Sequence, residues 1–348
     1  MAAISGANPV VASDVNNFTG ELFKITPHRT PLLAAAGGLN GGVATNSTFF
    51  QFQTQDNAAV SAVTPDDEGG APNYSGRSRA AQQGVLQIFH EAAQISYTAQ
   101  AASGEIVPFN LAGNYKNSDP ALALAGTNPI NDELAYQMEL VLETVAKKVE
   151  WAAFNASYND GTTGNRQMRG LKEHQDLSGG TAVNNDDGAG TPAAQKLNWD
   201  IIASGMKALY DAGAPMKQPV LFVSPTMLLD LNKELVKATV GSVNYGILPR
   251  DRNVGGVDID TIVTPFGSIG LALSDFLPAG TISGSKQSFI VDLSFVKPIF
   301  LNIPGYGTMF VRDLDQADNA RIAKAVYMEM AMDFGPQQYH CQIDNVIG

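Results

Sequence analysis

Apolar residues at helical spacing identify one long helix near the middle of the chain. Between residues 128 and 158 they return at steps of three or four, which places them on one face of a helix. Asn128 and Pro129 supply a favourable start, because Asn is preferred at the N-cap and Pro at the first helical position. About 28 residues at 1.5 Å each give a rod of roughly 42 Å, suited to a structural spine. Its apolar face comprises Ile130, Leu134, Met138, Val141, Val145, Val149 and Ala153.

The segments before this helix predict an arm and two strands joined by a long loop. Residues 14–25 and the segment PLLAAA have helical spacing, but neither has an apolar face large enough to fold alone. Residues 46–55 and 84–99 have the composition of strands. The connection between them lacks periodicity and is rich in Ala, Ser, Gly and Pro. Such a length is uncommon in a compact domain, so the loop is either functional or disordered, and the pattern leaves both open.

The second half of the chain alternates helices and strands and ends in a series of strands. Asn198 is placed to cap one helix, residues 219–223 form an apolar strand, and Ser224 with Pro225 opens another helix. Strands follow from residue 257, and the longest, over 321–334, has apolar residues at period 2 and would span roughly 43 Å. The pattern predicts an α+β (mixed α/β) fold. The long helix and the last strands form one cluster of elements, and residues 197–256 form another.

Composition indicates a chain with a sizeable core and a weakly charged surface. Its 348 residues suggest one large or two ordinary domains, and 44% of them are apolar. Charged residues make up 16%, below the ~25% usual for soluble domains. Such a surface indicates extensive contact with other subunits. A composition rich in Gly, Ala and Asn explains it equally well, and composition alone does not separate the two.

Net charge and cysteine content restrict the partners and the compartment. The net charge is −12, with no run of Lys or Arg, whereas tight nucleic-acid binders carry basic patches. Direct, tight binding of DNA is therefore not expected, and only weak, non-specific contacts with DNA are compatible with this charge. Cys341 has no cysteine partner in the chain, which fits assembly in a reducing cytoplasm. Neither a signal peptide nor an apolar stretch of ~20 residues is visible, so no membrane partner is expected.

Residues that usually carry catalysis or bind metals do not occur at productive spacings. HxH and HxxxH pairs are absent, and although folding can bring histidines together, satisfied or exposed side chains are the better interpretation. His340 and Cys341 point to opposite faces of an extended segment, which excludes a dyad. Residues 266–270 only resemble a G-x-S-x-G elbow and predict a hairpin turn. We expect no catalytic site, cofactor or metal. The histidines are His28, His90, His174 and His340.

Two acidic groups lie in predicted connections. Asp313, Asp315 and Asp318 precede the longest strand, and carboxylates at such spacing can hold calcium, although solvated turns are several times more common. The other group shares the long loop with two arginines, and these charges can pair within the loop or across a subunit boundary. Each exposed pair would contribute only ~0–1 kcal/mol. The candidate inter-subunit contacts are Asp66, Asp67, Glu68, Arg77 and Arg79.

The order of these elements resembles the major capsid proteins of tailed bacteriophages with the Hong Kong 97-type coat fold. In that order an arm and a two-stranded loop precede a long spine helix, an α/β region and a closing sheet. Several segments resemble the SU10-like branch in particular, and their order along nearly the whole chain carries the likeness. These segments are KITPHRTPLLAA, GVLQIFHEAAQISYTAQAASGE, NDELAYQMELVLETVAKKVEWAAFNAS, MRGL and DFLPAGTI, followed by the long strand.

The resemblance implies an assignment of domains and partners. It implies an N-terminal arm over 1–45, an extended loop over 46–100 that reaches a neighbouring subunit, and a peripheral domain that begins with 101–196. Residues 197–256 would form the axial domain, and strands within 257–348 would be shared between the two domains. Members of the family form the hexamers and pentamers of an icosahedral head around double-stranded DNA. A portal, and scaffold or decoration proteins, would be further partners in the virion.

One departure from the family concerns covalent crosslinks. Some members crosslink through a lysine in the extended loop, but no lysine occurs here between Lys24 and Lys116. The sequence therefore predicts a non-covalent shell. The chain begins almost directly at the arm, which implies a separate scaffold protein or none. The loop over 56–80 is expected to be needed for assembly rather than for folding.

Three other classes of protein remain as alternatives. An encapsulin-like compartment shell has the same fold and takes up enzyme cargo, and the sequence discriminates it poorly from a phage coat. An enzyme with an unusual site is disfavoured by the missing spacings. A surface adhesin is disfavoured by the missing export signal.

Overall fold

The fold is described from a computed structural model, which covers residues 29–39, 41–55, 79–98, 133–186, 193–239, 248–254, 257–314 and 320–348. Contacts divide the chain into two compact units. The smaller combines Met1–Pro27, Ala92–Leu142 and Arg312–Ala325. The larger combines His28–Glu91, Glu143–Val311 and Val326–Gly348, and it holds most of the elements described below.

The predicted spine helix is confirmed as α3, Glu133–Asn155. Val145, Val149 and Ala153, which the pattern placed on its apolar face, are buried. The helix ends three residues before the predicted position, and the side chain of its last residue, Asn155, donates to the carbonyls of Trp151 and Phe276 at 3.1 and 2.7 Å. The predicted start, with its Asn128 cap, lies outside the described residues.

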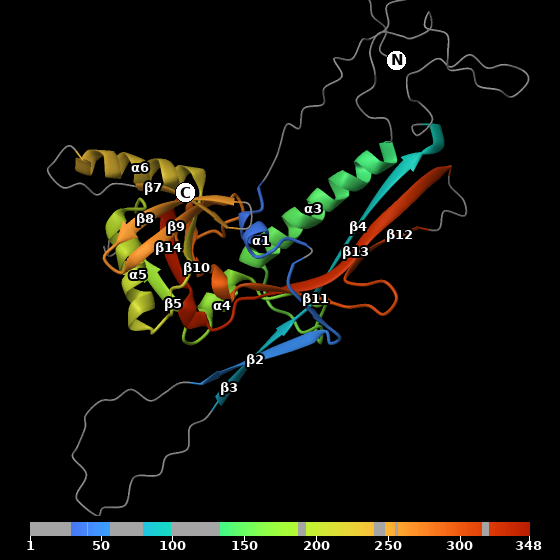
Figure 1. The fold of residues 1–348 in the computed structure, drawn as a ribbon, viewed down its shortest axis with the longest axis horizontal. Coiled ribbons are helices and arrows are strands. Elements are labelled where there is room, and N and C mark those ends of the chain that lie inside the picture. The colour runs from blue at the N-terminus through green and yellow to red at the C-terminus, as the bar shows by residue number, and fades with distance from the viewer. Residues whose placement is uncertain are drawn as a thin grey trace, which may run out of the picture. The chain divides into compact units, whose positions relative to one another are not determined.

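A seven-stranded mixed sheet forms the centre of the larger unit (Figure 1). The helices α5, Trp199–Asp211, and α6, Pro225–Thr239, accompany it, and Asn198 caps α5 as predicted by accepting the N–H of Ile201 at 2.8 Å. In spatial order the strands are β5 (Thr181–Asn184), β14 (Cys341–Ile347), β10 (Ser285–Asp292), β6 (Pro219–Val223), β9 (Gly267–Leu273), β8 (Val257–Thr264) and β7 (Leu248–Val254).

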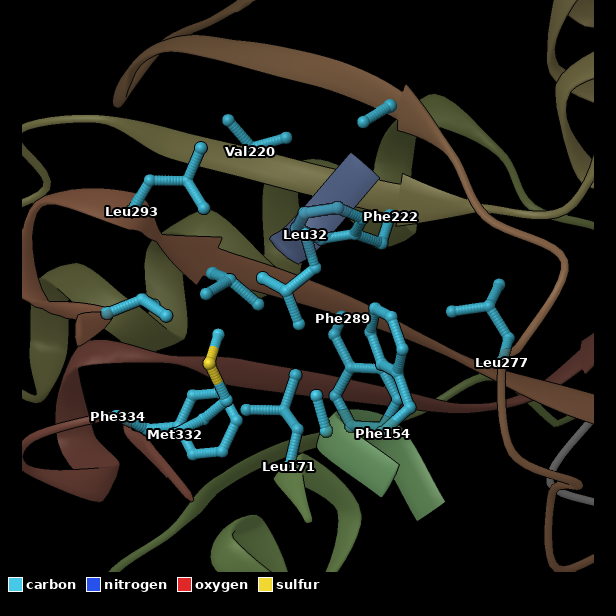
Figure 2. Packing of buried hydrophobic residues seen from close by; sticks show 14 of the residues in the cluster. Leu32, Phe154, Leu171, Val220, Phe222, Leu277, Phe289, Leu293, Met332 and Phe334 are labelled. Carbon is cyan, nitrogen blue, oxygen red and sulfur yellow. The ribbon is translucent and has the colours of Figure 1, made fainter. Parts of the chain in front are cut away.

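The hydrophobic core joins this sheet to the end of the spine helix. The ring of Phe154 lies 5.6 Å from that of Phe222 on β6 and 6.0 Å from that of Phe289 on β10. Leu32 of the short helix α1, Pro31–Ala35, belongs to the same cluster, as Figure 2 shows. The segment predicted to need support from outside itself is thus anchored in the body of the subunit.

A second sheet contains five strands in the order β1, β11, β13, β12, with β4 also paired to β13. Val326, Met328, Met330 and Met332 of β13 are buried at the spacing that the sequence predicted. The strands are β1 (Val43–Thr45), β11 (Lys297–Leu301), β13 (Arg321–Asp333), β12 (Met309–Asp313) and β4 (Gln87–Ser96).

The two-stranded loop differs from the prediction in its second strand. β2, Phe49–Gln55, pairs with β3, Arg79–Val85, in antiparallel register from Phe49 opposite Val85 to Gln55 opposite Arg79. The predicted strand over 84–99 belongs mostly to β4, which pairs with β13 instead. β3 could not be predicted from the sequence, because its Arg, Ala and Gln residues have little preference for strands. They are extended because they pair with β2.

Several elements lacked a clear pattern and were not predicted. They include β14, which follows the long strand, and β5, which pairs with it in parallel. The helix α4, Leu171–Asp176, is also new. Residues 197–256 supply β6 and β7 to a sheet whose other strands lie outside that range, so they do not form a cluster by themselves. None of the helices in the described parts of the chain is long and apolar enough to cross a membrane.

Candidate assembly surfaces

Most of the predicted contact residues lie outside the described parts of the chain. These are Asp66, Asp67, Glu68 and Arg77, so whether they pair stays a prediction. Arg79 is exposed at the first position of β3. The acidic group before the long strand is similarly divided, because Asp313 pairs with Lys324 at 3.3 Å whereas Asp315 and Asp318 are not described.

The β2–β3 hairpin exposes amide and apolar side chains over most of its length. Gln51 lies opposite Gln83 on one face, and Phe52 lies opposite Gln82 on the other. Arg79 is the one charged residue of these two strands. An isolated two-stranded sheet is marginally stable in water, and edge strands usually carry charges that prevent pairing with other chains. The hairpin therefore has the properties of a segment that another surface covers.

A glycine within the hairpin accommodates one of its aromatic rings. Gly84 lies opposite Phe50, and a Cβ at this position would stand 2.2 Å from the tip of that ring. The ring thus covers the backbone of the neighbouring strand close to the base of the hairpin.

Glu150 of the spine helix holds the first turn of α1. Its carboxylate is fully buried and accepts the backbone N–H groups of Leu32 and Leu33 at 3.0 and 2.7 Å. Burial raises the pKa of this carboxyl to about 7, and the two hydrogen bonds offset part of that rise. The point at which the N-terminal segment joins the body therefore depends on one titratable side chain.

Folding brings together two histidines that the sequence placed far apart. The ring centroids of His174 and His340 are 6.3 Å apart, and both side chains are buried. His340 accepts the N–H of Asp292 on Nδ1 at 3.2 Å, so its proton lies on Nε2, which is 2.5 Å from the carbonyl oxygen of Phe334. Burial is the main reason that the pKa falls to about 3 for His174 and about 4 for His340.

Burial keeps both imidazoles neutral at pH 7, and Nε2 of His174 is buried without a hydrogen-bond partner. Within the described residues no three His, Cys, Asp or Glu side chains gather as metal ligands would. Cys341 is buried as predicted, and burial raises the pKa of its thiol to about 12. The segment that resembled a nucleophile elbow is the predicted turn between β8 and β9, where Thr264 pairs with Gly267.

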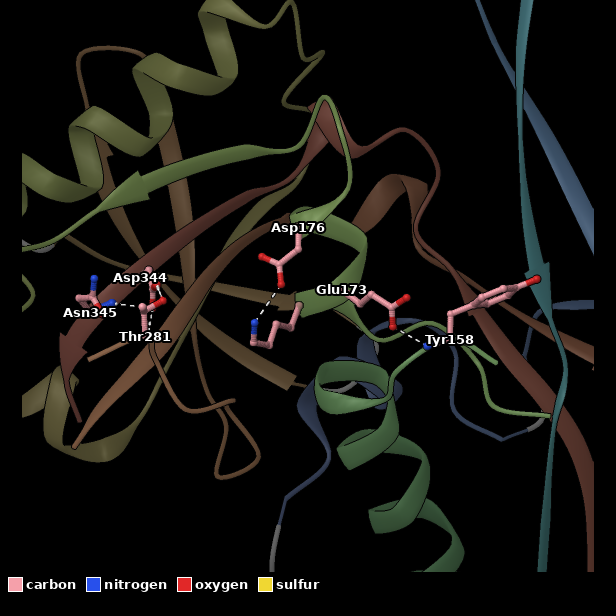
Figure 3. Close-up of polar contacts among 7 residues, drawn as sticks. Tyr158, Glu173, Asp176, Thr281, Asp344 and Asn345 are labelled. Carbon is pink, nitrogen blue, oxygen red and sulfur yellow. Dashed lines mark hydrogen bonds and ion pairs between the residues drawn. The ribbon is translucent and has the colours of Figure 1, made fainter. Parts of the chain in front are cut away.

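Polar side chains tie the connections of the larger unit to its strands and helices (Figure 3). Asp344 on β14 accepts the backbone N–H of Thr281 at 3.1 Å and also its hydroxyl. Glu173 on α4 accepts the N–H of Tyr158, just after the spine helix. Such ties fix the connections of the larger unit to its strands and helices.

Comparison with solved structures shows which class of protein has this fold. The chain aligns with the capsid of Cyanophage A-1(L) at a TM-score of 0.60 and 12% identity, covering 96% of this chain and 97% of that one. With the capsid of Myoviridae phage XM1 it aligns at a TM-score of 0.58 and 10% identity, covering 98% of this chain and 100% of that one. With the holo-SrpI encapsulin complex of Synechococcus elongatus PCC 7942 it aligns at a TM-score of 0.58 and 13% identity, covering 96% of this chain and 92% of that one. The fold is therefore the Hong Kong 97-type fold of phage coats and related shells.

The sequence itself identifies the family within this class. The family model of the SU10 major capsid protein matches residues 4–346, and the chain belongs to this family. It is thus a structural protein of the virion capsid that associates with copies of itself in an icosahedral head shell. A search among curated protein sequences finds no match.

Proposed function

We propose that this chain forms the hexamers and pentamers of a tailed-phage head that encloses double-stranded DNA. The family match over residues 4–346 carries this proposal. The uncovered, nearly uncharged β2–β3 hairpin supports it, because a hairpin of this kind is stabilised only when a second surface lies against it. The chain acts as a building unit and catalyses no reaction.

The domains proposed for this role follow the order of the family. The arm spans 1–45 and the extended loop 46–100, whose described part comprises the hairpin and β4. The peripheral domain begins with 101–196, the axial domain spans 197–256, and residues 257–348 give strands to both.

The shell is held without covalent crosslinks between subunits. No lysine occurs between Lys24 and Lys116, so the extended loop offers no amine for an isopeptide bond. Burial of apolar surface and many weak polar contacts would hold the subunits together instead. Denaturing electrophoresis of mature particles should give one band of subunit mass, and a ladder of linked subunits would contradict this proposal.

Assembly takes place in the host cytoplasm, with a portal and with scaffold or decoration proteins as further partners. The single cysteine, which is buried, is compatible with a reducing compartment. Packaged DNA makes weak, non-specific contacts with the shell, because the chain carries a net charge of −12.

Electron microscopy of the purified, concentrated full chain tests this function. Closed shells, or rings with five- and six-fold symmetry, are the expected result. A chain that stays monomeric at every concentration, measured by analytical ultracentrifugation, would exclude a role in building shells.

An encapsulin-like compartment is the second candidate, because the SrpI encapsulin shares the fold at a TM-score of 0.58. The family match favours the phage coat. Particles isolated from the natural source distinguish the two, since a phage head contains genome-length DNA and a compartment contains packaged protein.

A further inference from the structure

Four aromatic rings form a continuous row across the five-stranded sheet, and we call this row the aromatic ladder. It begins at His90 on β4 and continues to Tyr327 on β13, with ring centroids 5.7 Å apart. Phe310 on β12 follows at 5.4 Å, and Tyr306 in the turn before β12 lies 4.7 Å from Phe310. The ladder therefore joins three neighbouring strands and the turn between β11 and β12 within the larger unit.

The two ends of the aromatic ladder are open to solvent. Tyr306 is 65% exposed and His90 is also exposed, whereas the two rings between them are partly buried. Contacts between rings hold the side chains in fixed positions. Aromatic residues held in this way lose little conformational entropy on binding, which favours their use at interfaces between proteins.

The charge that touches the aromatic ladder is already neutralised within the subunit. Tyr327 donates its hydroxyl to Glu329 at 2.6 Å, and the other carboxylate oxygen of Glu329 binds Arg166 at 2.9 Å. Because Glu329 is paired with Arg166 inside the subunit, a partner can cover the rings without leaving this carboxylate unpaired. A surface adapted to phosphate groups would instead present its cation to the ligand.

A hollow lies beside the same strand, β4. Its volume is 720 Å³, and its wall includes Phe49 at the base of the hairpin and Ile88, two residues before His90 on the same face of β4. Arg166 contributes to this wall through the same side chain that pairs with Glu329. The rings thus lie beside a hollow whose wall combines the apolar side chains of Phe49 and Ile88 with polar ones, among them Arg166 and Asp160.

We propose that the aromatic ladder, with the adjoining hollow, is a contact surface for a second copy of this chain. The inference rests on the proposed shell-building function and specifies one of its contacts. The chain belongs to a family of coat proteins, so the partner present at the highest local concentration in a shell is another identical subunit. Nucleic acid is disfavoured as the occupant, because the chain carries a net charge of −12 and the exposed acid Asp160 lines the hollow.

Photo-crosslinking from the exposed end of the aromatic ladder tests the proposal directly. The full chain is produced with benzoylphenylalanine in place of Tyr306, which keeps an aromatic ring in the turn, and assembled particles are irradiated. Denaturing electrophoresis should reveal a subunit dimer whose crosslink mass spectrometry assigns to two copies of the chain. The same protein irradiated as dissociated subunits should give no dimer.

Other outcomes of the experiment overturn the proposal. These are an adduct with DNA, an adduct with a different protein, or the absence of any crosslink in sedimenting particles. If no particles form from the unmodified chain, the shell function itself fails, and sedimentation distinguishes that case before irradiation.

A pair of variants at Tyr306 provides an independent measurement. Tyr306→Ser should raise the concentration needed for assembly about tenfold, because aromatic side chains often dominate the energy of an interface. Tyr306→Phe keeps the ring and should assemble as the unmodified chain does. Since Tyr306 is mostly exposed and contacts only Phe310 in the row, Tyr306→Ser should lower the melting temperature of the subunit by a few degrees at most, and assembly is compared well below that temperature. Equal assembly by Tyr306→Ser would overturn the proposal.

Discussion

At the scale of single residues, Glu150 is an ionisable side chain that the fold buries away from solvent. It is fully buried, and its hydrogen bonds come from neutral backbone groups of Leu32 and Leu33. Burying a charge without an opposite charge is costly, so protonation of this side chain favours the docked position of α1. The docking of α1 should therefore weaken as the pH rises through neutrality.

We predict that Glu150→Gln removes a pH dependence from the stability of the unassembled subunit. The folded pKa of about 7 lies above the ordinary value of 4.5, so this contribution to stability is full below pH 4.5 and is lost as the pH rises through 7. Between pH 5.5 and 8.5 the unmodified subunit should lose about 2 kcal/mol of unfolding free energy through this residue. Urea unfolding at both pH values measures the loss.

The matched control is Glu139→Gln, which removes an exposed carboxylate from the same helix. It should keep the pH dependence of the unmodified chain. If Glu150→Gln retains the full loss of stability between pH 5.5 and 8.5, the assignment to this carboxylate is wrong.

The two buried histidines, His174 and His340, affect the stability of the subunit at acidic pH. Because the pKa of His174 falls from 6.5 to about 3, its contribution is present above pH 6.5 and is lost as the pH falls towards 3. We predict that His174→Asn is less stable than the unmodified subunit at pH 7, where it leaves a small cavity, and more stable at pH 4. The expected relief at pH 4 is about 3 kcal/mol before the cavity is considered.

Acid unfolding followed by circular dichroism measures this crossing of the two stability curves. Asp176→Asn, on the exposed side of the same short helix, should show no crossing. Parallel curves for His174→Asn and the unmodified chain would exclude charging of His174 as a cause of acid unfolding.

At the scale of elements, the β2–β3 hairpin contributes little to the core of the subunit. Its strands pair with each other, and their side chains are mostly exposed or half-buried. We predict that replacing residues 56–78 with an Asn-Gly turn leaves a folded subunit that does not assemble. The pair formed by Gln55 and Arg79 closes the hairpin at this point, and a two-residue turn of this type fits antiparallel strands.

Thermal melting and sedimentation together measure the outcome of this replacement. The melting temperature should stay within a few degrees of the unmodified value, while the shell peak disappears. An insoluble product would indicate a role in folding, and normal shells would indicate that the loop is dispensable for assembly.

Elements with strong local patterns could be predicted from the sequence, whereas elements formed by pairing could not. Helix α5 and strand β6 carry a capping residue or a continuous apolar run, so their positions follow from local physics. β3 and β5 contain few strand-favouring residues and are extended because partners hold them there. β4 was assigned to the wrong partner for the same reason, since strand pairing depends on contacts far along the chain.

The candidate surfaces were harder to predict than the fold. The row from His90 to Tyr306 combines residues from four segments, and no spacing in the sequence connects them. The pairing of Glu150 with α1 joins residues about 118 positions apart. The prediction from the sequence named charged residues of the long loop instead, because charges that are close together in the sequence can be recognised without knowing the fold.

At the scale of the whole molecule, the excess of acidic residues limits how strongly the subunit can bind DNA. With 34 acids and 22 bases the subunit repels DNA on average, so in the proposed head we expect the DNA to be confined by the closed shell rather than held by each subunit. We predict that unassembled subunits do not retard double-stranded DNA in a gel at 150 mM salt, and bind only weakly at 50 mM.

The dependence of this binding on salt measures how many phosphates the subunit contacts. Each phosphate neutralised by a protein cation gives a slope of roughly −0.9 in log affinity against log salt, so the slope should be shallower than about −2. A slope of about −4 or steeper would reveal a patch of at least four cations formed by folding, and the weak-contact proposal for DNA would then be wrong.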